Sequence, residues 1–289
     1  MAEISVVVCT MDRPAALARF VRGLLACDPP PSELVVVDEG VPPVADKLAP
    51  ALASSGLRYT YVRAPGRGVS GGRNDGAGAA AADLVAFTDD DCVPAPDWIG
   101  ALAAAYDQGF DGVTGRVLPL PAPPPAVAVS SRTSEVRRAF AGREQIPWDI
   151  GTGGNLSLRR AVVEAVGGFD EALGPGTHGR AAEDVDLLYR VTAAGFTILY
   201  EPEAVVYHEM KTRKARVGGR FGYGFGLGAF FSRHAGRGDR HARRLRRRYV
   251  GAVARRMAAG ARHGDPWPAV EGALTLAGIT AGSLRRGRA

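Results

Sequence analysis

The sequence predicts an α/β protein in which a mostly parallel central sheet is flanked by helices. Short apolar runs rich in β-branched residues recur in the first third of the 289-residue chain, and stretches with helical spacing separate them. The runs are apolar at consecutive positions, so the strands are expected to be buried on both faces, as in parallel sheets covered by helices. A basic stretch with helical spacing near the end of the chain predicts a helical C-terminal extension.

The predicted elements alternate along the chain. The strand runs are ISVVVCT, ELVVVDEG, LRYTYVRA and DLVAFTDDD, separated by helical stretches such as RPAALARFVRGLLACD and GGRNDGAGAAAAD. A helix, DWIGALAAAYDQ, then leads to the strand DGVTGRVLPL and to LPLPAPPPAVAV, whose proline density predicts a loop. The helix AEDVDLLYRVTAAG and the strand ILYEPEAVVYHE complete the body. Because the carboxyl ends of parallel strands share one edge, the acidic ends of these strands should meet there.

Charge divides the chain near residue 210. Residues 1–210 carry 17 Lys and Arg against 27 Asp and Glu, whereas residues 211–289 carry 19 against 3. We therefore expect a body at 1–210 and a basic extension at 211–289 that is rich in glycine and aromatic residues and is helical. The acidic body argues against extended contact with nucleic acid, and the basic extension favours an anionic partner, with membrane lipid and nucleic acid both open.

Several features predict a cytoplasmic protein. The three cysteines show no paired or metal-type spacing, which fits a reducing compartment. The N-terminal MAEISVVVCTMDRP lacks a basic leader, so we do not expect a signal peptide. The longest apolar stretch, AVEGALTLAGITAGSL, is interrupted by Glu271 and is too short to cross a bilayer. We expect a chain that can lie on the inner face of the cell membrane without spanning it.

Three adjacent carboxylates, Asp89, Asp90 and Asp91, end the fourth predicted strand. Adjacent carboxylates repel, so this arrangement is favourable only where a cation binds or water solvates it. Mg²⁺ and Mn²⁺ prefer oxygen ligands and leave coordination positions for phosphate oxygens. Alternate residues face the same way, so Asp89 and Asp91 should share a site while Asp90 diverges. The alternative is a solvated turn or helix cap before Pro94.

A second acidic cluster, Glu183, Asp184 and Asp186, opens a predicted amphipathic helix. Its acids would favour the helix dipole, and a carboxylate there is also a suitable base for a hydroxyl proton. His208 follows a predicted strand and, taken alone, is more often structural than a metal ligand. The stretch GRGVSGGRNDG formally matches GxGxxG, but it lies outside the first strand-helix unit, which favours an anion-approach loop or a structural turn.

Taken in order, these residues resemble the family-2 inverting glycosyltransferases, which have the A-type nucleotide-sugar-binding fold. The similarity covers roughly residues 3–210. It implies a catalytic domain at 1–210, with a donor half at about 1–118 and an acceptor half at about 145–210. It also implies metal-dependent transfer of a sugar from a UDP-, GDP- or TDP-linked donor to an acceptor hydroxyl, by a single displacement that inverts the anomeric carbon. The acceptor would be a lipid-linked glycan or a natural product.

The resemblance implies roles for individual residues. Those near the nucleotide sugar would be Thr10, Asp12, Arg13, Asp38, Arg73, Asn74, Asp89 and Asp90. Mn²⁺ or Mg²⁺ would be held by Asp89, Asp91 and His208, and whether Asp91 alone or both aspartates bind stays open. The base would be Asp184, next to Glu183. On the acceptor side would lie Trp148, Gly153, Gly154 and Asn155.

The aromatic residues of the extension have two interpretations. Tyr223, Phe225, Phe230 and Phe231 would shape an acceptor entrance or enter a membrane interface, or else they pack the extension on the body. Two other functions are also open. A metal-dependent nucleotidyltransferase uses similar carboxylates, but its Gly-rich, Lys-bearing loop near the N-terminus is missing. A nucleic-acid-binding protein would use the basic extension, against which the acidic body counts.

Overall fold

A nine-stranded sheet forms the centre of the molecule, with strand order β3-β2-β1-β4-β9-β6-β10-β5 and with β8 paired to β10. The computed structural model describes residues 2–284 except 46–47, 49–51, 54, 123–125 and 129–130. The strands of this sheet are β1 (Ile4–Thr10), β2 (Glu33–Asp38), β3 (Tyr59–Arg63), β4 (Leu84–Asp89), β5 (Cys92–Pro94), β6 (Gly112–Pro119), β8 (Arg138–Phe140), β9 (Leu156–Arg159) and β10 (Ile198–His208).

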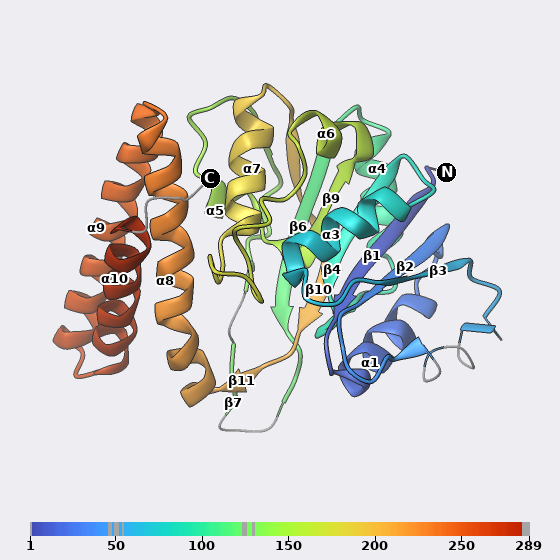
Figure 1. The fold of residues 1–289 in the computed structure, drawn as a ribbon, viewed down its shortest axis with the longest axis horizontal. Coiled ribbons are helices and arrows are strands. Elements are labelled where there is room, and N and C mark those ends of the chain that lie inside the picture. The colour runs from blue at the N-terminus through green and yellow to red at the C-terminus, as the bar shows by residue number, and fades with distance from the viewer. Residues whose placement is uncertain are drawn as a thin grey trace.

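Helices flank this sheet on both faces, and three long helices stand beside it (Figure 1). In the body they are α1 (Pro14–Leu25), α3 (Gly68–Ala79), α4 (Trp98–Tyr106), α5 (Pro147–Ile150), the 3-10 turn η1 (Gly153–Asn155), α6 (Arg160–Ala165) and α7 (Glu183–Ala193). The three beside it are α8 (Arg213–Gly236), α9 (Arg240–Arg262) and α10 (Trp267–Leu284). The predicted fold class, including the helical C-terminal extension, is confirmed.

Strand direction places the acidic strand ends at one edge. β1, β2, β3 and β4 are mutually parallel, and β6 and β10 run the same way. β5, β8 and β9 run in the opposite direction. Most of the sheet is therefore parallel, as predicted, and β1, β4 and β10 bring their carboxyl ends to the same side.

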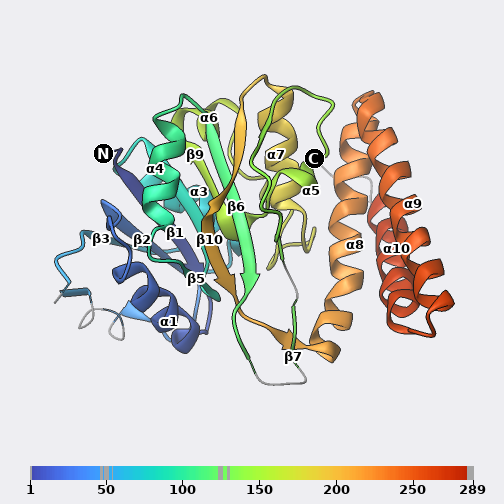
Figure 2. The ribbon, with the colours of Figure 1, turned by 180° about the vertical axis from the view of Figure 1, so that it is seen from behind.

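The apolar strand runs are buried on both faces. Val6 and Val8 pack in one core with residues of α1 and α4, whereas Val7 packs in a second core with residues of α3, α6 and α7. Figure 1 shows α3, α6 and α7 in front of the sheet, and Figure 2 shows α1 and α4 covering its other side. This two-sided burial explains why the runs are apolar at consecutive positions.

The Gly-rich stretch after β3 forms helix α3, so the interpretation as an anion-approach loop is wrong. Its glycines let the helix lie close to the sheet. A Cβ at Gly76 would meet Cγ1 of Val7 at 2.4 Å. A side chain at this position would push α3 away from β1, because core packing leaves no space for it. The match to GxGxxG involves Gly66, Gly68 and Gly71 instead, and Gly66 and Gly68 have positive φ values of 75° and 66° where the chain turns into α3.

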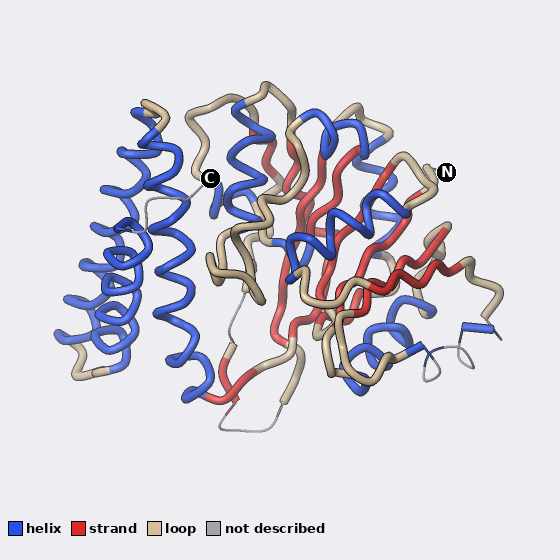
Figure 3. Tube along the Cα trace, in the orientation of Figure 1, coloured by secondary structure: helices blue, strands red, loops and turns tan. Residues whose placement is uncertain are grey.

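The Pro-rich segment is partly described. Residues 123–125 and 129–130 lie outside the described residues, and between them β7 (Ala126–Val127) pairs antiparallel with β11 (Lys211–Thr212). Figure 3 shows the connections of the body in tan, including the long segment between α6 and α7. β7 thus joins the segment after β6 to the chain just before α8.

The C-terminal helices pack on the body and on each other. Leu227, Phe230 and Phe231 of α8 form an apolar cluster with Val185 and Tyr189 of α7. α8 and α10 approach through glycines: a Cβ at Gly224 would lie 2.1 Å from the carbonyl oxygen of Thr275, and one at Gly282 would lie 2.0 Å from that of Phe225. The described part of the extension is thus a packed layer of the molecule. No helix among the described residues has the length and apolar character needed to cross a membrane.

Candidate functional site

The acidic triplet forms the turn between β4 and β5. Asp89 ends β4, Asp90 and Asp91 make the turn, and β5 begins at Cys92. β5 pairs antiparallel with β10 in a register that sets Cys92 opposite His208. His208, which comes more than one hundred positions after the triplet in the sequence, is thereby placed beside it.

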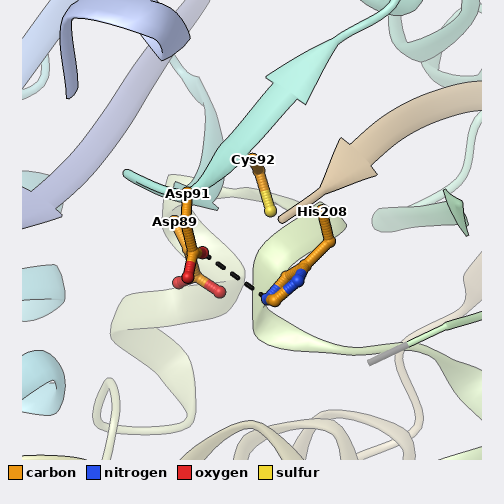
Figure 4. A group of neighbouring side chains, drawn as sticks. All are labelled: Asp89, Asp91, Cys92 and His208. Atoms are coloured by element: carbon orange, nitrogen blue, oxygen red, sulfur yellow. Dashed lines mark ion pairs between the residues drawn. The ribbon is translucent and has the colours of Figure 1, made fainter. Parts of the chain in front are cut away.

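Asp89, Asp91, Cys92 and His208 each offer a ligand atom, and these atoms lie within 4.8 Å of one another. Figure 4 shows both carboxylates beside the imidazole ring of His208. The Nδ1 atom of His208 lies 2.8 Å from the carbonyl oxygen of Glu209, and its Nε2 atom lies 3.5 Å from Oδ1 of Asp91. A proton on Nδ1 satisfies that carbonyl and leaves Nε2 free to bind a metal.

The donor atoms suit a hard divalent cation. Two carboxylates and one imidazole match the ligands of Mn²⁺ and Mg²⁺ sites that also hold phosphate oxygens. Burial raises the pKa of the Cys92 thiol well above its usual value, so this group stays a neutral thiol at pH 7. The residues that fit the cation are therefore Asp89, Asp91 and His208.

Cationic groups surround Asp91. Nη2 of Arg13 lies 2.9 Å from its Oδ2 atom, and Nζ of Lys211 lies 3.5 Å from the same oxygen. Burial opposes ionisation of Asp91, but His208, Arg13 and Lys211 together lower its pKa. Lys211 belongs to no motif in the sequence, and it is the ion pair with Asp91 in the structure that shows it reaching the triplet.

Asp90 faces the interior. It is almost completely buried, and it accepts hydrogen bonds from the Thr10 hydroxyl at 2.8 Å and from Nη1 of Arg13 at 2.6 Å. Burial raises its pKa to about 6. The expectation that Asp90 and Thr10 contact the nucleotide sugar is not supported, because these contacts occupy both side chains and join β1 to the turn.

Asp38 also serves the fold. Its buried carboxylate accepts hydrogen bonds from the backbone N–H groups of Gly40 and Val44 and from the hydroxyl of Tyr61. In the structure its oxygens shape the loop after β2, and the expected contact of Asp38 with the nucleotide base stays a prediction. Asp12 is exposed and has a positive φ of 56°, and its Oδ1 atom accepts from the N–H of Val41.

Arg73 lies at the centre of the site. Its side chain is buried, with Nη2 donating to Asp89 Oδ1 at 2.7 Å and Nη1 donating to Glu183 Oε1 at 3.0 Å. The guanidinium also stacks over Phe169, 5.2 Å from the ring centroid. Burial alone would lower the pKa of Arg73, but Asp89 and Glu183 outweigh it and raise the pKa. Arg73 thus joins the two acidic clusters.

Asn74, the next residue, points away from the site. Its Nδ2 atom donates to the carbonyl oxygen of Phe169 and its Oδ1 atom accepts from the N–H of Phe169. The expectation that Asn74 faces the nucleotide sugar is not supported, because consecutive residues of a helix point in different directions and Asn74 is used to hold the segment after α6.

Asp184 lines the same pocket as Asp89 and His208, two of the residues that fit a cation, and this pocket has a volume of about 90 Å³. The pocket is lined by Arg73, Asp89, Val117, Thr152, Gly153, Gly154, Glu183, Asp184 and His208. The N–H of Gly153 donates to Asp184 Oδ2 at 2.9 Å, and the N–H of Val185 donates to Oδ1 at 2.7 Å. These bonds fix the carboxylate at the start of α7 with both oxygens oriented.

Glu183 differs from Asp184 in its surroundings. It is buried against Arg73, and burial together with the charge of Asp184 raises its pKa to about 7. Asp184 is only partly buried and lines the pocket. Of the two neighbours, Asp184 is therefore placed to meet a ligand, and Glu183 is placed to hold Arg73.

The residues expected on the acceptor side divide in two groups. Gly153 and Gly154 line the pocket, where a Cβ on Gly153 would meet Nη1 of Arg73 at 2.6 Å. Asn155 is buried and bonded to Trp98, Arg116 and Ala204, which gives it a structural role, and its expected acceptor role stays a prediction.

Two further residues bear on this side of the site. Trp148 packs edge-on against Phe231 and Tyr249, at centroid distances of 6.2 and 5.0 Å. Thr152 was not singled out in the sequence. Its hydroxyl is buried, without a hydrogen-bond partner among the described residues, and it lines the pocket.

The aromatic residues of α8 also separate by role. Phe230 and Phe231 are buried against α7, so packing is the correct interpretation for them. Arg180 stacks over Phe225, 5.5 Å from its ring centroid. Tyr223 lines a larger cavity of about 430 Å³, formed by residues 176–181 and the first turns of α8. Tyr223 therefore lies between this cavity and the start of α7.

Comparison with known proteins gives one family. Residues 5–167 match the model of Glycosyl transferase family 2. The chain is 27% identical over 230 residues to a glucosyl-dolichyl phosphate glucuronosyltransferase of Haloferax volcanii, covering 72% of this chain and 69% of that protein. It is 27% identical over 232 residues to a pre-mycofactocin glycosyltransferase of Mycobacterium tuberculosis, covering 75% of this chain and 46% of that protein.

Solved structures share the fold. A mannosyltransferase from Pyrobaculum calidifontis in complex with GDP-Man and Mn²⁺ is similar with a TM-score of 0.67 and 17% identity, covering 99% of this chain and 88% of the other. A fragment of TarS from S. aureus in complex with UDP is similar with a TM-score of 0.59 and 16% identity, covering 78% of this chain and 65% of the other.

Proposed function

The chain belongs to glycosyl transferase family 2, and we propose that it moves a hexosyl group from a nucleoside-diphosphate sugar to an acceptor hydroxyl with inversion. One observation carries the proposal. Asp89 and His208, which fit a divalent cation, line the same pocket as Asp184, which fits a general base. An electrophile held at one wall and a base at the other is the arrangement that a single displacement requires.

The donor would be held at the triplet. Mn²⁺ or Mg²⁺ would be bound by Asp91 and His208 together with Asp89, and when bound it would neutralise negative charge on the diphosphate. Arg13 and Lys211 hold Asp91 ionised from the other side. We propose that Lys211 also faces the diphosphate, because its side chain is 40% exposed beside the carboxylate that its ammonium group contacts.

The acceptor hydroxyl would be deprotonated by Asp184. The N–H of Gly153 holds one carboxylate oxygen and the N–H of Val185 holds the other, so the group is oriented at the start of α7 to accept a proton. Glu183 and Arg73 would not exchange protons with the substrate, because they are buried and bonded to each other. Their part is to fix the distance between Asp89 and the start of α7.

The choice of substrates follows from the relatives by similarity. The neighbours hold UDP or GDP-Man, so we propose a UDP- or GDP-linked donor, with a TDP-linked donor as the third candidate. The Haloferax relative is named for a lipid-linked substrate and the mycobacterial one for a natural product. We propose an acceptor of one of these two kinds, and the cavity at Tyr223 offers it about 430 Å³.

We also propose peripheral contact with anionic lipid at the cytoplasmic face of the membrane. The exposed arginines in the first half of α9 support it: Arg240, Arg243, Arg244, Arg246, Arg247 and Arg248. Each basic residue near a negatively charged leaflet contributes about 1 kcal/mol to binding. The same helix buries its opposite side, including Leu245, against the body.

Donor hydrolysis tests the proposed function. The protein is incubated with Mn²⁺ and with UDP-, GDP- and TDP-sugars, and slow release of nucleoside diphosphate is measured with and without EDTA. We expect release from one nucleotide class and its loss in EDTA. Release of pyrophosphate would instead indicate a nucleotidyltransferase, and no turnover of any donor in the presence of Mn²⁺ would reject the proposal.

A further inference from the structure

Three arginines converge on one buried carboxylate among the C-terminal helices. Glu271 of α10 is 5% exposed. Arg216 of α8 lies 2.9 Å from its Oε1 atom, and Arg220 of α8 and Arg256 of α9 lie 3.3 and 3.4 Å from its Oε2 atom. Among the described residues, no second carboxylate pairs with these arginines. The cluster therefore carries three positive charges against one negative charge.

Two of the three arginines are mostly shielded from bulk water. The side chains of Arg216 and Arg220 are only 21% and 20% exposed. The Nε atom of Arg216 faces Glu271, whereas the Nε atom of Arg220 is buried and lacks a hydrogen-bond partner within the described part of the chain. Burying an unpaired charge and an unsatisfied donor is costly unless an anion binds there. Guanidinium groups in this number match the several acceptor oxygens of a phosphoryl group.

The cluster adjoins the catalytic pocket through two tyrosines. Tyr223 follows Arg220 by one turn of α8, and Tyr249 of α9 packs with it in the same apolar cluster. That cluster also contains Ala182 and Val185, which flank Glu183 and Asp184 at the start of α7. Tyr223 thus links Arg220, one turn before it on α8, to the end of α7 that lines the catalytic pocket.

We propose that Arg216, Arg220 and Arg256 form a subsite that binds a phosphoryl group of the acceptor. The proposal rests on the function proposed above and names the acceptor class. The acceptor would carry a free hydroxyl, which would lie at Asp184, and a phosphate, which would lie at the arginines on the far side of Tyr223. The donor diphosphate would instead meet Arg13 and Lys211, the cations that pair with Asp91.

Inorganic phosphate is the first probe. Its binding to the full chain is measured by equilibrium dialysis in the presence of Mn²⁺ and saturating UDP or GDP, whichever the donor test identifies, so that the donor position is filled. Arg256→Gln is the main variant, because Arg256 is 58% exposed and its loss should not disturb folding. Arg255→Gln is the matched control, since Arg255 is the exposed neighbour on α9. We expect Arg256→Gln to weaken phosphate binding about tenfold, as for the loss of one charge-assisted hydrogen bond, and Arg255→Gln to leave it unchanged.

Vesicles distinguish the source of the phosphate. Phosphatidylcholine vesicles containing one-fifth phosphatidic acid are tested with the same variants. Weaker binding of Arg256→Gln to both probes supports a lipid phosphate, and weaker binding to inorganic phosphate alone supports a soluble phosphorylated acceptor. Equal binding of wild type and Arg256→Gln to both probes, or equal losses in Arg255→Gln, would overturn the subsite.

A second variant should change the affinity for phosphate in the opposite direction. Glu271→Gln removes the carboxylate that competes for the arginines, so we expect a folded Glu271→Gln protein to bind phosphate more tightly than wild type. Weaker binding by a variant with an unchanged melting temperature would contradict the proposal. Donor hydrolysis by wild type is measured in parallel. If it is absent while phosphate binding still depends on Arg256, the glycosyltransferase assignment fails and the phosphate site remains.

Discussion

Arg73 donates a hydrogen bond of 2.7 Å to Asp89, and through its other terminal nitrogen it holds Glu183. The guanidinium thus fixes the end of β4 relative to the start of α7. We expect Arg73→Met to lower activity by at least a hundredfold and stability by about 3 kcal/mol, because two carboxylates lose their partner in a buried place. Donor hydrolysis and thermal unfolding measure the two effects.

The double variant Arg73→Met with Glu183→Gln separates stability from activity. It removes the buried acid along with the arginine, so stability should recover in part while activity stays low. Recovery of activity would show that Arg73 serves only to neutralise Glu183.

Asp184→Asn tests the base. The amide keeps an oxygen for the N–H of Gly153 but cannot accept a proton, so transfer should fall by about a hundredfold to ten-thousandfold. Nucleotide binding in Mn²⁺, measured by calorimetry, should stay close to that of wild type. Glu164→Gln, an exposed position on α6, is the control. Undiminished transfer by Asp184→Asn would assign the base to another residue.

His208→Ala tests the metal site. Loss of one of the proposed ligands should raise the Mn²⁺ concentration for half-maximal donor hydrolysis by about tenfold or more. His263→Ala removes an exposed histidine at the end of α9 and should leave the Mn²⁺ requirement unchanged. The same titration with Asp89→Asn and Asp91→Asn compares the aspartates, and a metal requirement unmoved by all three substitutions would place the cation elsewhere.

The lowered pKa of Asp186 predicts how the free energy of unfolding depends on pH. Asp186 is buried, with Nε2 of His234 at 2.7 Å and Nε of Arg190 at 2.6 Å. Burial opposes ionisation, but these two partners lower the pKa of Asp186. A carboxyl group whose pKa is lowered by folding stabilises the folded state at pH values above its unfolded-state pKa of about 3.9. This stabilisation is lost as the pH falls through the folded-state pKa.

We therefore expect Asp186→Asn to lower the free energy of unfolding by about 3 kcal/mol at pH 7, and the difference from wild type to shrink below pH 4. Asp107→Asn, at an exposed position after α4, is the control. Urea unfolding from pH 3 to pH 7 measures both, and a difference that does not change with pH would exclude the ion pair as its cause.

Two glycines of α8 offer a matched pair. Gly224→Ala would place a Cβ 2.1 Å from the carbonyl oxygen of Thr275 in α10, whereas a Cβ at Gly219 meets no atom within 4 Å. We expect Gly224→Ala to lower stability by about 2 to 3 kcal/mol and Gly219→Ala to raise it by up to about 1 kcal/mol. Equal melting temperatures for the two variants would refute close packing of α8 on α10.

The sequence predicted the sheet because its strands are apolar on both faces and the helices between them keep a helical period. It predicted the grouping of Asp89, Asp91, Glu183, Asp184 and His208 less directly, through the order of motifs along the chain. The strand register in the structure explains why His208 joins this group, since the pairing of β5 with β10 sets His208 beside the triplet.

Some polar contacts of the folded chain could not be predicted from the sequence. Asp38 and Asn155 look like ligands in the sequence, yet their polar atoms bond to groups that reach them only in the folded chain, such as the hydroxyl of Tyr61 and the indole of Trp98. Thr152 and Lys211 were not predicted as site residues because neither belongs to a sequence motif. Only their positions in the folded chain indicate a role at the site. Hydrogen-bond satisfaction of a buried group is a property of tertiary packing.

Helix α8 begins five residues after His208, and further along it covers the outer side of α7, which opens with Glu183 and Asp184. This has a consequence for protein engineering. A chimera that takes its last three helices from a relative would exchange the partner surface of α7 as well as the acceptor side. A workable crossover should therefore carry α7 and α8 together, and limited proteolysis should release α9 and α10 before it separates α8 from the sheet.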